Sequence, residues 1–336
     1  MRLGPGFVAL VLALCSCSAH DSPPSAPEPA RHRRSAPEQV PAPAASIDPV
    51  PPLPPSTYPA PARLVAIGDV HGDLDAFEDV LRAAGAIDAD AHWSGGALFV
   101  VQTGDLLDRG DQEREILDLV ARLEAEAEAA GGHFVALDGN HEYMNTQGDF
   151  RYATPGGFRD FEAFGEGATG EVYEGIPPRM RGRIAAFRPG GAYARAFAAR
   201  DTIIRVGGTL LVHGGVLAPH LAEGLDAINQ DGRAFFLGQA PLSPTLAAED
   251  GPIWYRGFAM QDDEATCARL DDALAAAGAE RMVVGHTKQA DGITFACDRR
   301  VVRIDVGLAR IYQGPIQALE IVGDDMRVLT GTRTAP

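Results

Sequence analysis

Acidic, histidine and asparagine side chains recur in this sequence directly after short apolar runs. In the stretch Thr103–Gly110, Asp105 follows the run Ala97–Val101 and is followed three residues later by Asp108 and then by Arg109. A carboxylate at the end of a buried strand can bind a divalent cation, and a planar guanidinium can hold a phosphate through paired hydrogen bonds. Taken alone, an aspartate in this position is equally compatible with a helix cap.

Four other apolar runs end in the same way. The side chains that follow them are Asp69 and His71, then Asn140 and His141, then His213, and finally His286. Together with Asp105 they form a mixed set of oxygen and nitrogen donors, which suits two hard or borderline divalent ions. The repetition of this pattern at five strand ends favours a metal site over unrelated caps and turns.

The apolar runs predict the strands that position these side chains. Strands are expected at residues 63–67, 97–101, 133–137, 209–212 and 281–284. A helix capped by Asp73 is expected to follow the first strand and to end at Gly85, because its apolar residues fall on one face. A second helix is expected over residues 112–130. Strands alternating with helices predict right-handed βαβ units and an α/β fold.

The bulk composition excludes some functions. The formal net charge is −17, and a field of that sign repels nucleic acid backbones, so no nucleic acid partner is expected. No apolar stretch after the N-terminus is long enough to cross a membrane. Two cysteines, Cys267 and Cys297, lie in the expected folded part, and their spacing leaves open whether they form a disulfide or remain buried free thiols.

The N-terminus reads as an export signal. Residues 1–17 contain one arginine and an apolar core, which predicts a signal peptide, and the ending Leu14–Cys17 resembles a bacterial lipoprotein cleavage box with Cys17 as the lipidated residue. Ordinary signal cleavage is the alternative. Residues 18–62 are rich in proline and alanine and predict a disordered linker. The catalytic domain is expected at 63–330, on the periplasmic face of a bacterial membrane (the outer membrane favoured), or secreted or periplasmic without lipidation.

The motifs together resemble the calcineurin-like metallophosphoesterases. They are Gly-Asp-x-His-Gly at 68–72, Gly-Asp-x-x-Asp-Arg-Gly at 104–110, Gly-Asn-His-Glu at 139–142, His-Gly-Gly at 213–215 and Gly-His-Thr at 285–287. The Asp-Arg-Gly motif is similar to that of the PPP phosphatases. Residues 147–152 and 253–257 resemble the bacterial Shewanella-like protein phosphatases. The resemblance implies two mixed β-sheets packed as a sandwich flanked by helices, with metals at the strand carboxyl ends.

The resemblance also implies roles for individual residues. The metal ligands would be Asp69, His71, Asp105, Asn140, His213 and His286, with Asp105 shared by two divalent ions. Mn²⁺ is expected, and Fe or Zn are alternatives. Arg109, Arg256 and Asn140 would bind the substrate phosphate. His141 would donate the proton to the leaving group, oriented by Asp108, although a plain hydrogen-bonding role for His141 stays open.

The expected reaction is hydrolysis of phosphate monoesters by direct attack of a hydroxide that bridges two metals. The expected substrate is a phosphorylated protein or peptide, with phosphotyrosine preferred and phosphoserine or phosphothreonine as further substrates. A small phosphoester is the alternative substrate. One alternative is a dinucleoside polyphosphate hydrolase acting on diadenosine tetraphosphate, and another is a non-catalytic metal-loaded protein that binds phosphorylated ligands. The arginine-rich region 148–200 is expected to form either a substrate-binding wall or surface ion pairs. Within it, residues 184–199 are expected to be irregular at first and then helical.

Overall fold

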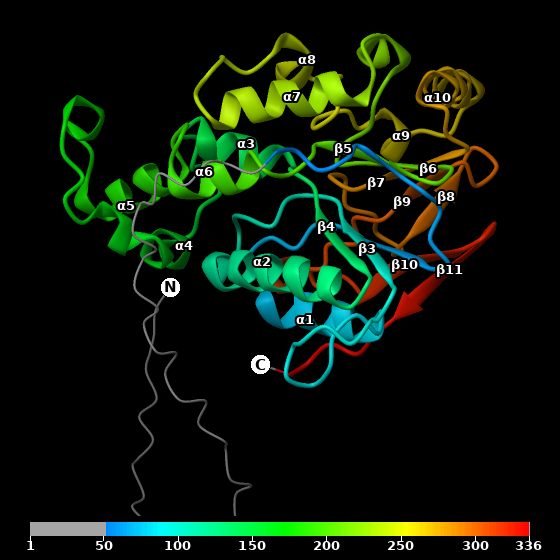
Figure 1. The fold of residues 1–336 in the computed structure, drawn as a ribbon, viewed down its shortest axis with the longest axis horizontal. Coiled ribbons are helices and arrows are strands. Elements are labelled where there is room, and N and C mark those ends of the chain that lie inside the picture. Colours follow the sequence, from blue (N-terminus) through cyan, green and yellow to red (C-terminus); the bar gives the residue numbers. More distant parts are fainter. Residues whose placement is uncertain (1–51, 336) are drawn as a thin grey trace, which may run out of the picture. The chain divides into compact units, whose positions relative to one another are not determined.

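The computed structural model describes residues 52–335, which form two mixed β-sheets with helices around them (Figure 1). The predicted signal peptide, the lipidation site at Cys17 and most of the predicted linker lie outside the described residues. Apolar side chains from both sheets and from the covering helices belong to one continuous core. The expected α/β fold with two mixed sheets is therefore confirmed.

The first sheet carries the N-terminal ligand motifs. It has five strands in the order β11-β10-β2-β3-β4, and β2, β3 and β4 run parallel. The strands are β2 (Leu64–Ile67), β3 (Phe99–Gln102), β4 (His133–Ala136), β10 (Gln317–Val322) and β11 (Asp325–Thr330). β2 and β3 are buried along their whole length, which explains why they read as unbroken apolar runs.

The second sheet carries the two late histidines. It has six strands in the order β1-β5-β6-β7-β9-β8, with β6, β7 and β9 parallel. The strands are β1 (Thr57–Tyr58), β5 (Ile203–Val206), β6 (Thr209–Val212), β7 (Arg281–Val284), β8 (Thr294–Ala296) and β9 (Val301–Arg303). All five predicted strands are present, and each boundary agrees with the prediction to within two residues.

The linker predicted to run to residue 62 ends earlier. β1 pairs in parallel with β5, and the Tyr58 ring packs edge-on against Phe99 with centroids 5.0 Å apart. The folded part therefore begins before Arg63. This strand could not be recognised in the sequence. It has only two residues, which are too few to show a period, and prolines surround it.

The helices cover the sheets and fill the long connections. Their bounds are α1 (Leu74–Ala83), α2 (Glu113–Ala129), α3 (Asn140–Thr146), α4 (Pro155–Asp160), α5 (Pro178–Phe187), α6 (Ala192–Phe197), α7 (Leu225–Phe236), α8 (Pro244–Ala247), α9 (Gly257–Met260) and α10 (Glu264–Ala277). Short 3₁₀ turns occur at Glu162–Gly165, Glu171–Tyr173, Ala218–Leu221 and Arg310–Tyr312. In Figure 1, α1 and α2 lie together on the five-stranded sheet, and the segment from α4 to α6 projects to the left.

Two of the helix predictions can be compared directly with these bounds. α1 begins after Asp73, whose carboxylate accepts a hydrogen bond from the Ala76 backbone N–H, as the predicted cap requires. The sequence predicts that residues 184–199 are irregular at first and then helical. Residues 184–187 belong to α5 instead, whereas residues 188–191 are non-helical and α6 confirms the helix that was predicted to follow them. The helix α5 was hidden because the face that it buries includes Gly182 and Arg183 as well as Ala186 and Phe187, and therefore shows no apolar period.

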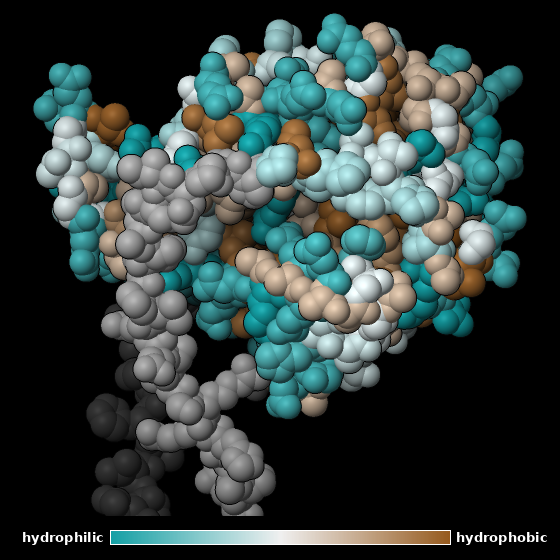
Figure 2. Space-filling view, viewed as in Figure 1, coloured by the Kyte–Doolittle hydropathy of each residue, from teal (hydrophilic) through white to brown (hydrophobic). Residues whose placement is uncertain are grey.

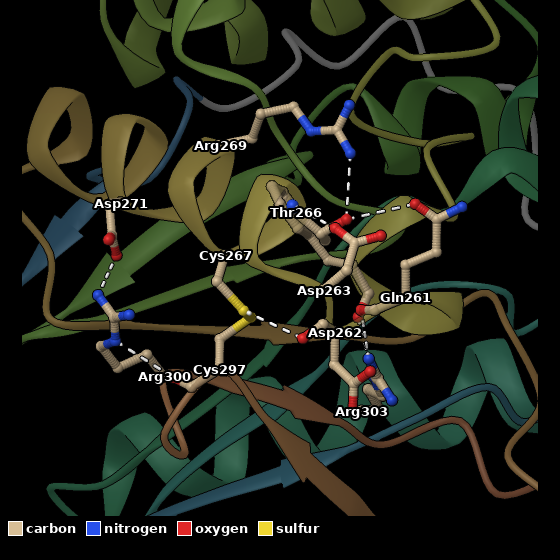
Figure 3. Close-up of a disulfide and its surroundings, with 11 residues drawn as sticks. Gln261, Asp262, Asp263, Thr266, Cys267, Arg269, Asp271, Cys297, Arg300 and Arg303 are labelled. Carbon is tan, nitrogen blue, oxygen red and sulfur yellow. Dashed lines mark hydrogen bonds and ion pairs between the residues drawn. A yellow bond between two sulfur atoms is a disulfide. The ribbon is translucent and has the colours of Figure 1, made fainter.

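A disulfide joins Cys267 in α10 to Cys297, which directly follows β8 (Figure 3). The cysteines are 30 residues apart in sequence, so the bond ties a surface helix to the turn between β8 and β9. The alternative of two free thiols is therefore not what the structure contains. Spacing could not decide between the two, because disulfide formation requires that the folded chain bring the sulfur atoms together.

The surface seen in Figure 2 is mostly hydrophilic and is broken by small apolar patches. Among residues 52–335, none of the helices combines the length and the apolar character that crossing a membrane requires.

Candidate metal centre and phosphate site

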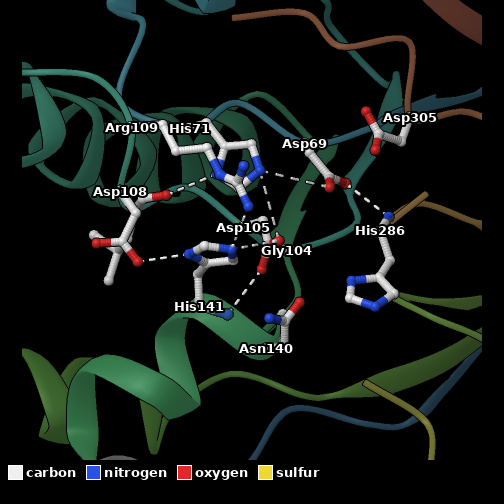
Figure 4. A network of polar contacts seen from close by, with 12 residues as sticks. Asp69, His71, Gly104, Asp105, Asp108, Arg109, Asn140, His141, His286 and Asp305 are labelled. Atoms are coloured by element: carbon white, nitrogen blue, oxygen red, sulfur yellow. Dashed lines mark hydrogen bonds and ion pairs between the residues drawn. The ribbon is translucent and has the colours of Figure 1, made fainter. Parts of the chain in front are cut away.

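The side chains that follow β2, β3, β4, β6 and β7 come together beside one cavity. Figure 4 shows those that follow β2, β3, β4 and β7. All the predicted metal ligands are brought together there, and all are buried. Two groups of side chains have ligand atoms within 4.8 Å of one another and could hold a metal ion. One is Asp105 with His213 and His286, and the other is Asp105 with His71 and His141, beside which Asp69 also lies. Asp105 belongs to both groups.

The first group surrounds the His213 imidazole. Its Nδ1 lies 2.9 Å from the Thr103 carbonyl, so Nδ1 carries the hydrogen and Nε2 presents a lone pair when the ring is neutral. That Nε2 lies 2.9 Å from Asn140 Oδ1, 3.1 Å from His286 Nδ1 and 3.3 Å from Asp105 Oδ2. When His213 is neutral, its Nε2 lone pair faces these oxygen and nitrogen atoms at short range, an arrangement that a bound cation would satisfy.

The second group surrounds His71. Its Nδ1 is fixed by the Leu107 carbonyl at 2.9 Å, which leaves Nε2 directed at two carboxylates. Nε2 lies 3.9 Å from Asp69 Oδ2 and 3.8 Å from Asp105 Oδ2. Asp69 is held in turn by the His286 backbone N–H at 3.1 Å. The donor set of both groups therefore fits two divalent ions with Asp105 placed between them.

The turn that carries Asp105 has a strained backbone that Glu142 holds in place. Asp105 lies in the left-handed region with φ 59°. The buried Glu142 carboxylate accepts hydrogen bonds from the backbone N–H groups of Asp105, Leu106 and Gly139 at 2.8–3.0 Å. A Cβ on Gly139 would lie 2.3 Å from Asp105 Oδ1, so only glycine fits there. Two motifs that are distant in sequence thus fix each other.

The pKa values at the site are shifted in opposite directions. Burial would lower the pKa of His213, but Asp105 and Asp69 raise it to about 9. Burial and the neighbouring His213 lower the pKa of His286 to about 2. Burial and the nearby Asp305 raise the pKa of Asp69 well above its usual value. Such crowding of perturbed groups is characteristic of functional sites.

His141 and Asp108 form the predicted pair. His141 Nδ1 lies 2.5 Å from Asp108 Oδ2, and the His141 backbone N–H donates to Asp105 Oδ1 at 2.9 Å. Burial would lower the pKa of His141, but Asp105 and Asp108 raise it overall. His141 Nε2 lies toward the cavity, 3.2 Å from Arg109 Nη2. Asp108 therefore orients the His141 ring through Nδ1, and Nε2 of the ring faces the cavity.

The two predicted phosphate-binding arginines line the same cavity. The Arg109 guanidinium lies over the rings of Tyr152 and Tyr312, 4.7 Å and 5.4 Å from their centroids, and it also hydrogen-bonds the Tyr312 hydroxyl. Arg256 is exposed and donates from Nη1 to the His286 carbonyl at 2.8 Å. Arg109 also contacts His141, and Arg256 contacts the His286 backbone, so both guanidinium groups lie beside the metal site.

Several cavity residues were missed from sequence. Asp305 follows the end of β9, is 5% exposed, and shares a hydrogen bond with Asp69. Tyr152, Trp254, Lys288 and Tyr312 also line the cavity. The signal for Asp305 was present, because it follows the apolar residues of β9 just as the other ligands follow their strands. The interruption by Arg303 hid that pattern.

The arginine-rich region gives a mixed result. Arg179 and Arg188 are exposed, whereas Arg183 is fully buried and contacts Asp108 and Glu113. For Arg183, both expectations are wrong, since it is neither part of a substrate wall nor paired on the surface. Burial was not foreseeable from sequence because both acidic partners lie 70 or more residues away.

The chain is similar to known phosphoesterases in both sequence and structure. Residues 62–289 match the model of the calcineurin-like phosphoesterase family. Shewanella-like protein phosphatase 2 of Arabidopsis thaliana is 39% identical over 304 residues, which cover 80% of this chain and 78% of that protein. The structure of a cold-active protein-tyrosine phosphatase of a psychrophilic Shewanella is 26% identical, with a TM-score of 0.65 and 83% of each chain covered. A Saccharomyces cerevisiae protein serine/threonine phosphatase, 15% identical, shares the fold with a TM-score of 0.53 over 84% of this chain and 85% of that one.

Proposed function

Because this chain belongs to the calcineurin-like phosphoesterases and, within them, to the Shewanella-like protein phosphatases, it is a phosphoester hydrolase, and we propose that it dephosphorylates proteins with phosphotyrosine preferred. The observation that carries the proposal is the single turn 104–110. It supplies the shared ligand Asp105, the acid Asp108 that orients His141, and the phosphate-binding Arg109.

The aromatic lining of the cavity supports the phosphotyrosine preference. Tyr152, Trp254 and Tyr312 stand around Arg109 and Arg256. A phosphotyrosine ring can pack on such side chains while its phosphate reaches the arginines, whereas the short phosphoserine side chain cannot make those contacts. The related Shewanella structure is that of a protein-tyrosine phosphatase, which is consistent with this preference.

A neighbouring groove supports a peptide rather than a small substrate. It is mainly apolar, includes Ala153 and Phe158, and begins one residue after the cavity residue Tyr152. Arg159 and Arg179 also line it, together with Glu162. A peptide that continues beyond the phosphorylated residue would find apolar contacts there and two cations for acidic side chains.

In the proposed reaction, Arg109, Arg256 and Asn140 bind the phosphate oxygens and offset the charge that develops on them. Asp69, His71, Asp105, Asn140, His213 and His286 would hold two divalent ions, which when bound lower the pKa of an attacking water and polarise the phosphate. Direct attack by that water leaves no covalent intermediate on the chain. Mn²⁺ is the proposed ion, since the donors are hard or borderline oxygen and nitrogen atoms.

His141 then gives its proton to the leaving oxygen. Its Nε2 faces the cavity, and Asp108 binds the hydrogen on Nδ1, which fixes the ring and favours the charged form before transfer. We expect His141→Ala to retain metals and to lose rate, because the ring lies beside the ligands without being required as one.

We propose that the protein is exported and anchored through lipid on Cys17, with outer-membrane attachment favoured and a periplasmic or secreted form as the alternative. Support comes from the signal-like residues 1–17 and from the Cys267–Cys297 disulfide, which fits an oxidising compartment. Mass spectrometry of the mature N-terminus tests this. A mature N-terminus at a lipid-modified Cys17 is expected, and an unprocessed Met1 in the purified protein would contradict export.

Turnover of three substrates tests the main proposal. Purified protein with Mn²⁺ is assayed on a phosphotyrosine peptide, the same peptide with phosphoserine, and diadenosine tetraphosphate. The highest kcat/KM is expected for the phosphotyrosine peptide, with His141→Ala as the matched inactive control. Faster cleavage of diadenosine tetraphosphate would favour the dinucleotide hydrolase. Tight binding of the peptides without turnover of any substrate would favour a binding protein.

A further inference from the structure

Arg183 is a fully buried arginine at the centre of the segment that separates the metal-ligand motifs. It lies in α5 and none of its side chain is exposed. Phenylalanine rings surround its guanidinium at 5.2–5.8 Å, and they are Phe150, Phe158, Phe161 and Phe187. A charge so far from water requires fully paired partners, and those partners show what the arginine acts on.

All five N–H groups of Arg183 are used. Nε donates to Asn145 Oδ1 at 2.8 Å, and Nη1 donates to Glu113 Oε2 at 2.5 Å and to the Gly157 carbonyl at 2.9 Å. Nη2 donates to Asp108 Oδ1 at 3.0 Å and to Glu113 Oε1 at 3.2 Å. A planar guanidinium whose five N–H groups are all hydrogen-bonded is held in one orientation. The ammonium group of lysine cannot form the same set of hydrogen bonds.

The two oxygens of Asp108 are thereby divided between two partners. Oδ1 accepts from Arg183, while Oδ2 faces His141 Nδ1 at 2.5 Å and accepts from Asn145 Nδ2 at 3.0 Å. The same Asn145 amide donates to the His141 carbonyl at 2.9 Å. In Figure 4, His141 lies between Asp108 and the shared ligand Asp105. Arg183 therefore holds, directly and through Asn145, the acid that orients the imidazole.

We propose that Arg183 is a positioning residue for proton donation, which fixes the Asp108 carboxylate so that one of its oxygens is always directed at His141. The proposal rests on the proposed role of His141 as proton donor. In this role, the segment from α4 to α6 contributes to the reaction without lining the cavity, because Arg183 contacts Asp108 on the side away from the substrate.

A purely structural ion pair would behave differently. If Arg183 only stabilised the core, its substitution would lower stability and leave the rates of the folded protein unchanged, or lower them equally for every substrate. A positioning role depends on the leaving group, because an aryl oxide that is already stable in water needs no proton in the transition state. The test therefore compares 2,4-dinitrophenyl phosphate, which needs no proton donor, with phenyl phosphate, which does.

Arg183→Lys in the full Mn²⁺-loaded chain is the first variant. We expect kcat for phenyl phosphate to fall by about 10-fold to 100-fold, and kcat for 2,4-dinitrophenyl phosphate to fall by less than about 3-fold. KM and bound metal should stay at wild-type values. Arg188→Lys, the same change at an exposed arginine directly after α5, should leave every quantity unchanged. Equal losses on both substrates, or no loss on either, would overturn the proposal.

Coupling to Asp108 gives a second readout. Once Asp108→Asn has removed the oriented carboxylate, adding Arg183→Lys should lower kcat for phenyl phosphate no further, because both changes act through one path. Multiplying losses would show that Arg183 acts elsewhere, and would contradict the proposal.

Two additional variants keep the outcome interpretable. If Arg183→Lys does not fold, Arg183→Met combined with Glu113→Gln removes one buried charge of each sign and should give the same dependence on the leaving group. His141→Ala tests the premise separately. If it shows no dependence on the leaving group, the proposed role of His141 fails. If His141→Ala shows the dependence and the Arg183 variants do not, only the role of Arg183 fails.

Discussion

Removing the Cys267–Cys297 disulfide should destabilise the protein without changing its chemistry. The cross-link closes a loop of 30 residues and ties α10 to the turn after β8. In the unfolded chain, a loop of this length loses conformational entropy worth about 3.5 kcal/mol at 25 °C. The double variant Cys267→Ala/Cys297→Ala should therefore lose about that much stability. Its activity should not change, because both cysteines lie outside the cavity.

Urea unfolding followed by tryptophan fluorescence and circular dichroism measures the loss. The unfolding midpoint should fall, the thermal midpoint should drop by roughly 10 °C, and kcat at low temperature should stay unchanged. Non-reducing peptide mapping should recover the two cysteines in one cross-linked peptide. A loss below about 1 kcal/mol, or two free thiols in the mapped wild-type protein, would refute the reasoning.

Two further predictions concern buried carboxylates. The Glu142 carboxylate accepts hydrogen bonds from three backbone N–H groups, and Glu142→Gln would turn an amide N–H group toward those donors. This variant should lower the free energy of unfolding by about 2 kcal/mol and weaken metal binding. Glu128→Gln, the same change on an exposed part of α2, should change neither stability nor metal binding. Burial and the nearby Asp226 raise the pKa of Asp201 to about 7, so the folded state binds this proton more tightly than the unfolded state. The contribution of Asp201 to stability should therefore fall as pH rises from about 4 to about 7, by on the order of 3 kcal/mol, and Asp201→Asn should remove that fall in urea titrations at several pH values. An unchanged pH dependence in the variant would show that other groups cause it.

The sequence was sufficient to predict a site residue wherever that residue directly follows an apolar strand. Asp105 and His286 follow continuous apolar runs, and the parallel pairing of such strands brings their ends together. Sequence failed where a role depends on tertiary contact. In the sequence, Arg183 is one of several arginines in the same segment, and its partner Asp108 lies 75 residues away. Nothing local therefore indicated their contact. Asp305 was hidden by a charged residue in its strand, and the edge strand at Tyr58 was too short for any period to show.

Metal content measured together with turnover tests the central claim most directly. The claim is that Asp105 is shared by two divalent ions, as its place in both ligand groups indicates. We predict that the Mn²⁺-reconstituted protein carries two ions per chain by elemental mass spectrometry, and that Asp105→Asn loses most of that metal together with all activity on the phosphotyrosine peptide. His141→Ala should keep the metal and lose rate. Near wild-type metal content in Asp105→Asn would contradict the shared site.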